Sequence, residues 1–329
     1  REFMPTLPVW RGNSPIQPLP RQEEPIAEIP FTRSSGETCT IADFLNDSYT
    51  DAFLVMCDGK IIHESYYNGM TPETPHLMQS VSKSITATVT GIMIGRGDLD
   101  PQAPVESYLP ALEQTAWKGA KLQHVLDMTT GVDYSEEYTR LDSDVGKTDV
   151  ASGWRPVHPD ASPDIDWPKT VWDQILSLKN TYTEHGSAFL YRSIETDLLA
   201  HIMMHVSGMP LHDLLSKELW QKIGAEEDGY FTVDAAGYGL ASGGFNGCLR
   251  DFGRFGQLYL NDGMHNGERI VPAEWIADVR RGPHGLFSGE RRRLLPQGCY
   301  RNQFWIEDQT TEAAMCLGVF GQLIYIAPA

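Results

Sequence analysis

The chain has 329 residues, of which 41% are hydrophobic and 21% are charged, enough to build one or two globular cores. Its formal net charge of −18 at pH 7 argues against nucleic acids and anionic membrane surfaces as partners. Its apolar runs all fall short of the roughly 18 residues that a membrane-spanning helix needs. These features favour a globular protein that binds neither nucleic acid nor membrane.

The N-terminal segment, residues 4 to about 35, is expected to form an irregular lead-in. Proline fixes the backbone and removes a hydrogen-bond donor, and it recurs here at positions 5, 8, 15, 18, 20, 25 and 30. Residues 1–3, ahead of Met4, are interpreted as a cloning remnant, so a native leader that has been removed stays an open alternative.

The first regular elements are a hairpin and a long helix. Apolar runs at 52–57 and 60–66 flank Asp58-Gly59, which predicts a hairpin on a two-residue turn. An amphipathic helix is predicted from Ser80. Its apolar stripe is Val81, Ile85, Val89 and Ile92, and it should stop at Gly95 and Gly97.

Later elements alternate between helices and strands. Helices are predicted at 122–128, 193–206, 211–223, 249–260 and 273–279, and strands at 303–306 and 317–326. Residues 131–170 show no clear periodicity, and a loop of this length is usually functional.

This order predicts an α+β fold, an α/β sandwich. We expect an antiparallel sheet with flanking helices, built from 36–104 and 231–329, plus a mostly helical inserted domain at 105–230.

Ser80 and Lys83 are the first candidate catalytic residues. They lie one turn apart on the same face of the predicted helix. A lysine can take the proton of a serine hydroxyl, and the free N–H groups of a helix start can stabilise an oxyanion. The pattern is short, however, and an ordinary capped helix with an exposed lysine is the alternative.

Two further features could complete such a site. Tyr191 lies just ahead of a predicted helix, where its phenol could relay a proton beside an ammonium group. Gly318 and Gly321 on the late strand would let its backbone approach a ligand and donate N–H groups. The alternatives are a packing tyrosine and a strand with small residues.

The cysteines and histidines do not suggest a metal or redox site. Five cysteines are scattered along the chain without C-x-x-C or metal-ligand spacing. We interpret them as reduced thiols, which favours a cytoplasmic protein, although one disulfide stays possible in principle. We expect no metal and no organic cofactor.

In the order Ser-x-x-Lys, Tyr-x-Ser and a late glycine-containing strand, the chain resembles the serine β-lactamase, penicillin-binding-protein and family VIII carboxylesterase superfamily. It is most similar to the 6-aminohexanoate-dimer (nylon-oligomer) hydrolases. The matching segments are Met78 to Ser84, Gly95 to Leu99, Glu137-Tyr138 with Asp149 and Ser152 to Trp154, Tyr191 to Ser193 with Thr196-Asp197, Thr232 to Asp234 with Gly237, Gly239, Gly243 and Gly244, and Arg250-Asp251.

The resemblance implies a β-lactamase/transpeptidase-like fold and a role for each matched residue. Ser80 would be the acylated nucleophile, and Lys83 and Tyr191 would transfer protons. The N–H groups of Ser80 and Val319 would form the oxyanion hole. Substrate would be bound by Tyr138, Asp149, Ser242, Trp305 and Phe320. Asp149 would pair with a free amine. Apart from the resemblance, a solvated loop acid is the alternative for Asp149, and packing on Trp154 is the alternative for Tyr138.

Departures from the superfamily motifs narrow the chemistry. Ser193 replaces the Asn of the β-lactamase Tyr-x-Asn, and Val319-Phe320-Gly321 replaces Lys-Thr-Gly. The nylon-oligomer enzymes carry a histidine where this chain has Phe320, which cannot donate a hydrogen bond and favours a more apolar substrate. Members of the superfamily continue beyond the position of Ala329 with another strand and a terminal helix, and whether this chain does so stays open.

The sequence thus predicts a serine hydrolase that cleaves a small carboxylic ester or linear amide through an acyl-enzyme. A D-alanyl peptidase or weak β-lactamase is one alternative, and a non-catalytic penicillin-binding-like protein is another. A homodimer is compatible with the sequence but not indicated by it.

Overall fold

The computed structural model describes residues 4–281, 285 and 287–328, so the presumed cloning remnant at 1–3 lies outside the described residues. Its strands are β1 (Thr6–Val9), β2 (Pro30–Thr32), β3 (Thr38–Thr40), β4 (Ala52–Cys57), β5 (Lys60–Tyr66), β6 (His76–Leu77), β7 (Gly229–Thr232), β8 (Phe245–Gly247), β9 (Met264–His265), β10 (Glu268–Arg269), β11 (Cys299–Arg301), β12 (Phe304–Asp308), β13 (Ala313–Leu317) and β14 (Leu323–Ile326).

The helices vary widely in length. The α-helices are α1 (Ile41–Asp47), α2 (Val81–Arg96), α3 (Leu122–Leu126), α4 (Asp144–Ala151), α5 (Val171–Ser177), α6 (Ile194–Ser207), α7 (Leu211–Leu215), α8 (Leu249–Leu260), α9 (Ala273–Arg281) and α10 (Gly289–Leu294). The 3₁₀ turns are η1 (Ile26–Glu28), η2 (Val105–Ser107) and η3 (Pro110–Gln114), and a π-helical turn, η4 (Ser216–Trp220), extends α7.

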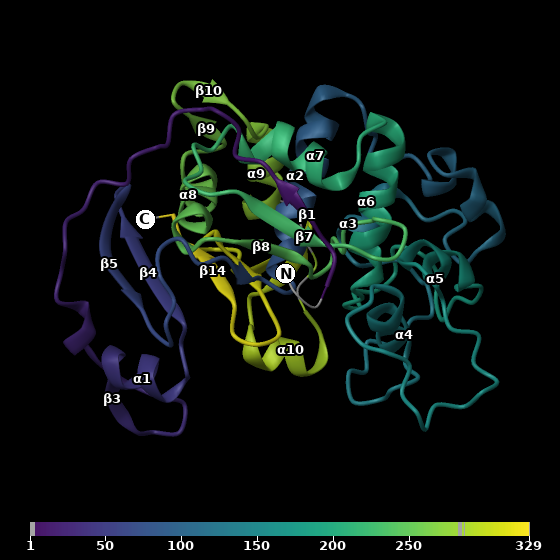
Figure 1. Ribbon diagram of the computed structural model, residues 1–329, viewed down its shortest axis with the longest axis horizontal. Helices are drawn as coiled ribbons and strands as arrows, with labels where there is room; N and C mark the ends of the chain where they lie inside the picture. The colour runs from purple at the N-terminus through teal and green to yellow at the C-terminus, as the bar shows by residue number, and fades with distance from the viewer. Residues whose placement is uncertain (1–3, 282–284, 286, 329) are drawn as a thin grey trace.

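All of the paired strands run antiparallel. One four-stranded sheet has the order β1-β7-β8-β6 and a second has the order β11-β12-β13-β14. The β4–β5 hairpin forms a separate pair at the left of Figure 1, and helices α3 to α6 gather at the right. Within residues 105–228 the regular elements are helices alone. That this segment folds as an inserted domain stays a prediction.

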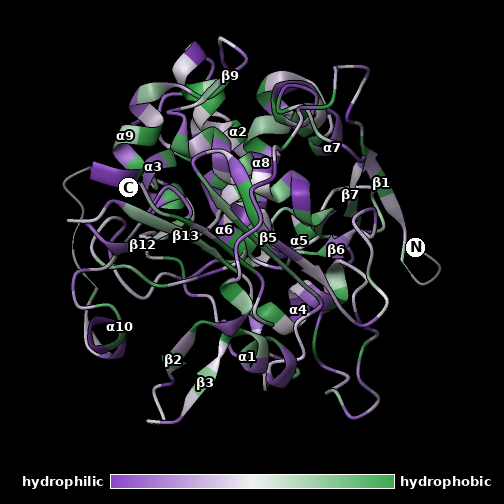
Figure 2. Cartoon of the chain, turned by 90° about the vertical axis from the view of Figure 1, so that its left-hand side faces the viewer, coloured by the Kyte–Doolittle hydropathy of each residue, from purple (hydrophilic) through white to green (hydrophobic). Residues whose placement is uncertain are grey.

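Several elements match the sequence predictions closely. The β4–β5 hairpin has the predicted bounds and turns at Asp58-Gly59. Helix α8 also has the predicted bounds, and α2 ends at Gly97, which adopts a left-handed conformation. Helix α9 shows hydrophilic and hydrophobic residues around its axis in Figure 2, and its buried side carries Trp275, Ile276 and Val279.

The prediction of an amphipathic helix at Ser80 was wrong in one respect. Every residue of α2 from Val81 to Met93 is buried, including the hydroxyl-bearing ones, because the helix packs on α6, α7, α9 and β13. Its polar groups find internal partners: Ser84 donates to the Gln303 carbonyl at 2.7 Å, and Thr88 shares a 2.8 Å hydrogen bond with Tyr259. A central helix therefore carries the candidate nucleophile.

Two segments predicted to be irregular contain regular structure. Strand β1 lies within the proline-rich lead-in and pairs with β7; Pro8 is tolerated there because β1 is at the edge of its sheet. Helix α4 lies within the predicted loop 131–170, where Ser143 caps it by accepting the Gly146 N–H. Sequence periodicity does not indicate either element. Strand β1 depends on its pairing with β7, and helix α4 depends on its cap at Ser143.

The predicted strand at 317–326 is a hairpin. Strand β13 ends at Leu317, the chain turns through residues 318–322, and β14 begins at Leu323. Gly321 has φ +91°, which marks the reversal. Val319 and Phe320 consequently lie in a turn.

No helix among the described residues combines the length and apolar character that would let it traverse a lipid bilayer.

Candidate active site

The chain turns sharply into α2 at Gln79 and Ser80. Gln79 has φ +49°, in the left-handed region that side chains other than glycine rarely adopt. Ser80 follows with helical angles as the residue that precedes the first turn, and its hydroxyl does not cap the helix. This leaves Ser80 Oγ available to other groups at a helix N-terminus.

Lys83 lies one turn later and is almost completely buried, with 1% of its surface exposed. Its Nζ donates to Ser80 Oγ at 2.8 Å and to the Ser242 carbonyl oxygen at 2.6 Å. The same nitrogen lies 5.1 Å from the centre of the Tyr191 ring. The structure therefore brings together the three side chains that the sequence selected, and the exposed-lysine alternative was wrong.

Tyr191 contacts Lys83 through its ring. It stacks on Trp305, with ring centres 5.5 Å apart, and meets Tyr300 edge-on at 6.1 Å. Its hydroxyl makes no hydrogen bond with any part of the chain that the structure describes. The next residue, Arg192, is fully buried and pairs with Glu195 at 2.8 Å while donating to the Val132 carbonyl at 2.7 Å, which fixes the start of α6.

Two backbone N–H groups beside Ser80 are available for an oxyanion. Neither the N–H of Ser80 nor that of Val319 donates to another residue within 4–281, 285 and 287–328. Gly318 brings the turn close to the nucleophile, because a Cβ there would lie 2.9 Å from the carbonyl oxygen of Met78. The exposed fraction of Val319 is 52% and that of Phe320 is 79%, so this side of the site is open.

Asp197 was not selected from the sequence. It lies on α6 and is buried, and its Oδ1 accepts the Ser242 N–H at 3.0 Å. Burial raises the pKa of Asp197 to about 7, against the opposing effect of hydrogen bonds from Ser242 and the charge of Lys83. The signal that could have identified it was the Thr196-Asp197 pair, which follows Tyr191 to Ser193 among the segments that match the superfamily.

Glu136 was also missed. It accepts hydrogen bonds from the Ser193 N–H at 2.9 Å, the Ser193 hydroxyl at 2.5 Å and the Tyr138 hydroxyl at 2.6 Å. Burial, together with the charge of Glu136, raises the pKa of Tyr138. No ring contact joins Tyr138 to Trp154 in the described residues, so Glu136 rather than Trp154 holds this tyrosine.

Asp149 lies on α4, partly buried. Burial raises its pKa to about 6, while Arg155, whose Nε lies 3.7 Å from the carboxylate, opposes the shift. That distance is too long for a hydrogen bond, and Arg155 Nε has no other partner among the described residues. The carboxylate thus retains unused acceptor capacity.

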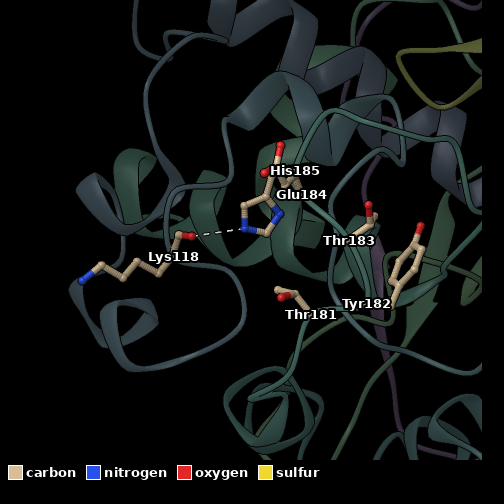
Figure 3. Close-up of a pocket in the computed structure, with 6 residues that line it drawn as sticks. All are labelled: Lys118, Thr181, Tyr182, Thr183, Glu184 and His185. Carbon is tan, nitrogen blue, oxygen red and sulfur yellow. Dashed lines mark hydrogen bonds between the residues drawn. The ribbon is translucent and has the colours of Figure 1, made fainter.

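A second, open pocket of about 520 Å³ is lined by a different set of residues: Lys118, Thr181, Tyr182, Thr183, Glu184 and His185. His185 accepts the Gly131 N–H at its Nδ1 (2.9 Å), so its Nε2 carries the proton and donates to the Lys118 carbonyl (Figure 3). Both ring nitrogens are therefore engaged in holding the loop.

Across the described ranges, no group of three or more His, Cys, Asp or Glu side chains is arranged to hold a metal ion.

Comparison with known proteins places this arrangement in a family. The β-lactamase family model matches residues 41–329. The chain belongs to the β-lactamase family. It is accordingly a hydrolase of the β-lactamase superfamily, with a fold of helices and antiparallel sheets, as the sequence predicted.

The most informative relatives share nearly the whole chain. It is 32% identical to a 6-aminohexanoate-dimer hydrolase of Paenarthrobacter ureafaciens, over 99% of this chain and 80% of that one. A Bacillus anthracis structure, provisionally named a 6-aminohexanoate-dimer hydrolase, is 30% identical with a TM-score of 0.87 and covers 99% of this chain and 83% of its own. EstCE1, a hydrolase with promiscuous acyltransferase activity, shares the fold at 18% identity, with a TM-score of 0.67 over 88% of each chain.

Proposed function

We propose that the protein is a serine hydrolase that cleaves a carboxylic ester or a linear amide through an acyl-enzyme. The observation that carries this proposal is the buried Lys83 amine, 2.8 Å from Ser80 Oγ at the start of a helix. An amine in its neutral form at that position can accept the serine proton.

Acylation would begin when Ser80 Oγ attacks the substrate carbonyl while Lys83, coupled to Tyr191, takes the proton. The N–H groups of Ser80 and Val319 would stabilise the tetrahedral oxyanion. When the intermediate collapses, the same pair returns the proton to the leaving alcohol or amine. A water molecule then attacks the acyl carbonyl and passes a proton to the pair. The bond between the acyl carbon and Ser80 Oγ breaks, Oγ takes that proton back, and the carboxylic acid is released.

We assign substrate recognition to the side of the site that is more exposed than the surroundings of Lys83. Asp149 would pair with an amine on the substrate, and Tyr138 would contact the scissile group. Trp305 and Phe320 would contact apolar parts, and Ser242 would contribute mainly through its backbone, since its side chain is buried. The name of the Paenarthrobacter ureafaciens relative supports a linear amide with a free amine as one substrate class.

The β-lactamase and D-alanyl peptidase alternatives receive less support. Ser193 replaces the Asn of their second motif, and Glu136 already engages its hydroxyl, so it is not free to hold a substrate amide. The turn carries Phe320 where their motif carries a polar residue. The hydrogen bond between Ser80 and Lys83 argues against the non-catalytic alternative, because a binding protein does not need a nucleophile next to a base.

The proposal is tested with a fluorophosphonate probe. We expect covalent labelling at Ser80, read by peptide mass spectrometry, and loss of labelling in Ser80→Ala. A panel of p-nitrophenyl esters, a linear aminohexanoate dimer, a D-alanyl peptide and a chromogenic cephalosporin then ranks the substrates. A folded wild-type protein that is neither labelled nor active on the panel contradicts the proposal.

A further inference from the structure

A chain of contacts runs from α6 to the candidate nucleophile. Asp197 Oδ1 accepts the Ser242 N–H at 3.0 Å, the Ser242 carbonyl oxygen accepts from Lys83 Nζ at 2.6 Å, and Nζ donates to Ser80 Oγ at 2.8 Å. Both backbone polar groups of Ser242 are thus hydrogen-bonded: its N–H donates to the Asp197 carboxylate, and its carbonyl oxygen accepts from Lys83.

The second oxygen of this carboxylate, Asp197 Oδ2, is buried and has no hydrogen-bond partner in the described part of the chain. A buried polar atom without a partner costs free energy and calls for a functional or structural reason. Here the free oxygen lets the carboxyl gain or lose a proton on Oδ2 while Oδ1 continues to accept from Ser242. The group can therefore change charge without releasing the backbone it holds.

Few other ionisable groups face Asp197. Helix α2 presents Lys83, and the segment before α4 presents Tyr134, which stays neutral because burial raises its pKa well above its ordinary value. On α6 itself, burial lowers the pKa of His201 to about 4, so that this ring is neutral too. The remaining acids and bases on these helices have other positions or partners. They are Arg96 at the end of α2, which pairs with Glu218; His124 on α3 and Asp127 just after it, which pairs with Arg301; Asp173 in the first turn of α5; Glu195, which pairs with Arg192, and His205 near the end of α6; and the His212–Asp213 pair on α7.

We propose that Asp197 is a positioning residue for Lys83: it fixes the Ser242 backbone that receives the lysine, and its charge sets how far down in pH the lysine can serve as a base. This inference rests on the proposed function, since Lys83 needs Ser80 as the group it activates. A nearby anion favours the protonated lysine, so removing the anion lets the lysine lose its proton at lower pH.

The experiment measures the rate of fluorophosphonate labelling and kcat/KM for a neutral p-nitrophenyl ester from pH 5 to pH 9. In Asp197→Asn, which keeps an oxygen for the Ser242 N–H, we expect the midpoint of the acid limb to move down by about one pH unit. In Asp197→Ala, which also loses the backbone contact, we expect kcat to fall roughly 10-fold or more with little change in KM.

Glu195→Gln is the matched control. Glu195 lies two residues earlier on α6, is equally buried and also has an oxygen without a partner among the described residues, but its bonds go to Arg192 and Thr130. Glu195→Gln also removes a buried carboxylate from α6, so it controls for any loss of stability that such a change causes. Because the hydrogen bonds of Glu195 do not go to Ser242 or Lys83, we expect the acid limb to keep its wild-type midpoint.

The outcomes separate this inference from the proposed function. If wild-type Ser80 is labelled and Asp197→Asn keeps both the wild-type rate and midpoint, the inference is overturned while the hydrolase proposal stands. An equal shift in Glu195→Gln overturns it as well. If wild-type Ser80 is not labelled at all, both fail together. Should Asp197→Ala not fold, Asp197→Asn alone decides.

Discussion

The two sides of the site differ in how much water reaches them. Lys83 on the nucleophile side is 1% exposed and fixed by two hydrogen bonds, whereas Phe320 on the substrate side is 79% exposed. Electrostatic interactions are strong where water is excluded and weak where it is not. Changes on the buried side should therefore affect the rate of any substrate, and changes on the open side should affect selected substrates by smaller factors.

The largest effect is expected from Lys83→Met, which keeps the apolar stem and removes the base. We expect kcat/KM for a neutral p-nitrophenyl ester to fall by about 10³-fold, because Ser80 loses its proton acceptor. Lys118→Met, at an exposed lysine paired with Glu113, is the matched control and should leave the rate unchanged. A fall of less than 10-fold in a folded Lys83→Met variant would show that the base lies elsewhere.

Tyr191→Phe probes the same side with a smaller change. The ring and its stacking on Trp305 remain, and only the hydroxyl is lost. We expect kcat to fall about 10²-fold with KM little altered, in keeping with the loss of one proton-transfer group. Tyr300→Phe removes a hydroxyl from the adjoining ring and should keep the wild-type kcat. Equal losses in the two variants would indicate packing rather than proton transfer.

The sequence predicts the buried side well because its signals are local. The start of α2 after Ser80 and its stop at Gly97 depend on neighbours within a few residues and have the expected places, as the Asp58-Gly59 turn does elsewhere in the chain, although α2 is buried on every side and not along one stripe. The spacing of Ser80 and Lys83 on one helix also fixes their contact without any tertiary information.

What the sequence could not supply depends on distant segments. Asp197 and Glu136 act through Ser242 and Ser193, which lie far away along the chain and meet them only in the folded protein. The turn at 318–322 was predicted as strand because the apolar residues around it mask the reversal, although Gly321 is a turn signal in retrospect.

Asp149→Asn tests the open side through charge. We expect KM for an ester that carries a free amine to rise about 10-fold, because a partly exposed ion pair is lost, and KM for a neutral ester to stay the same. Since burial raises the pKa of Asp149 to about 6, the carboxylate is charged above that pH and is neutralised as pH falls through it. Wild-type preference for the amine should thus disappear below about pH 6.

Asp142→Asn is the control for Asp149→Asn, because it makes the same change of charge at an exposed site paired with Arg140. It should alter neither KM nor its pH dependence. If both variants weaken the amine-bearing substrate equally, the preference arises from the overall negative field rather than from a contact with Asp149.

The smallest effect is expected from Phe320→Ala. Phe320 lies on the open side of the site with 79% of its surface exposed, so a bound acyl group would cover only one side of the ring; at roughly 25 cal/mol per Å² we expect KM for a long-chain acyl ester to rise only about threefold and that for an acetyl ester to stay constant. Leu323→Ala, at an exposed residue on β14, controls for loss of apolar surface and should leave both unchanged. A large loss of kcat/KM in Phe320→Ala that is the same for acetyl and long-chain esters would mean that this turn shapes the oxyanion hole through Val319. The open side of the site would then contribute to catalysis as well as to substrate selection.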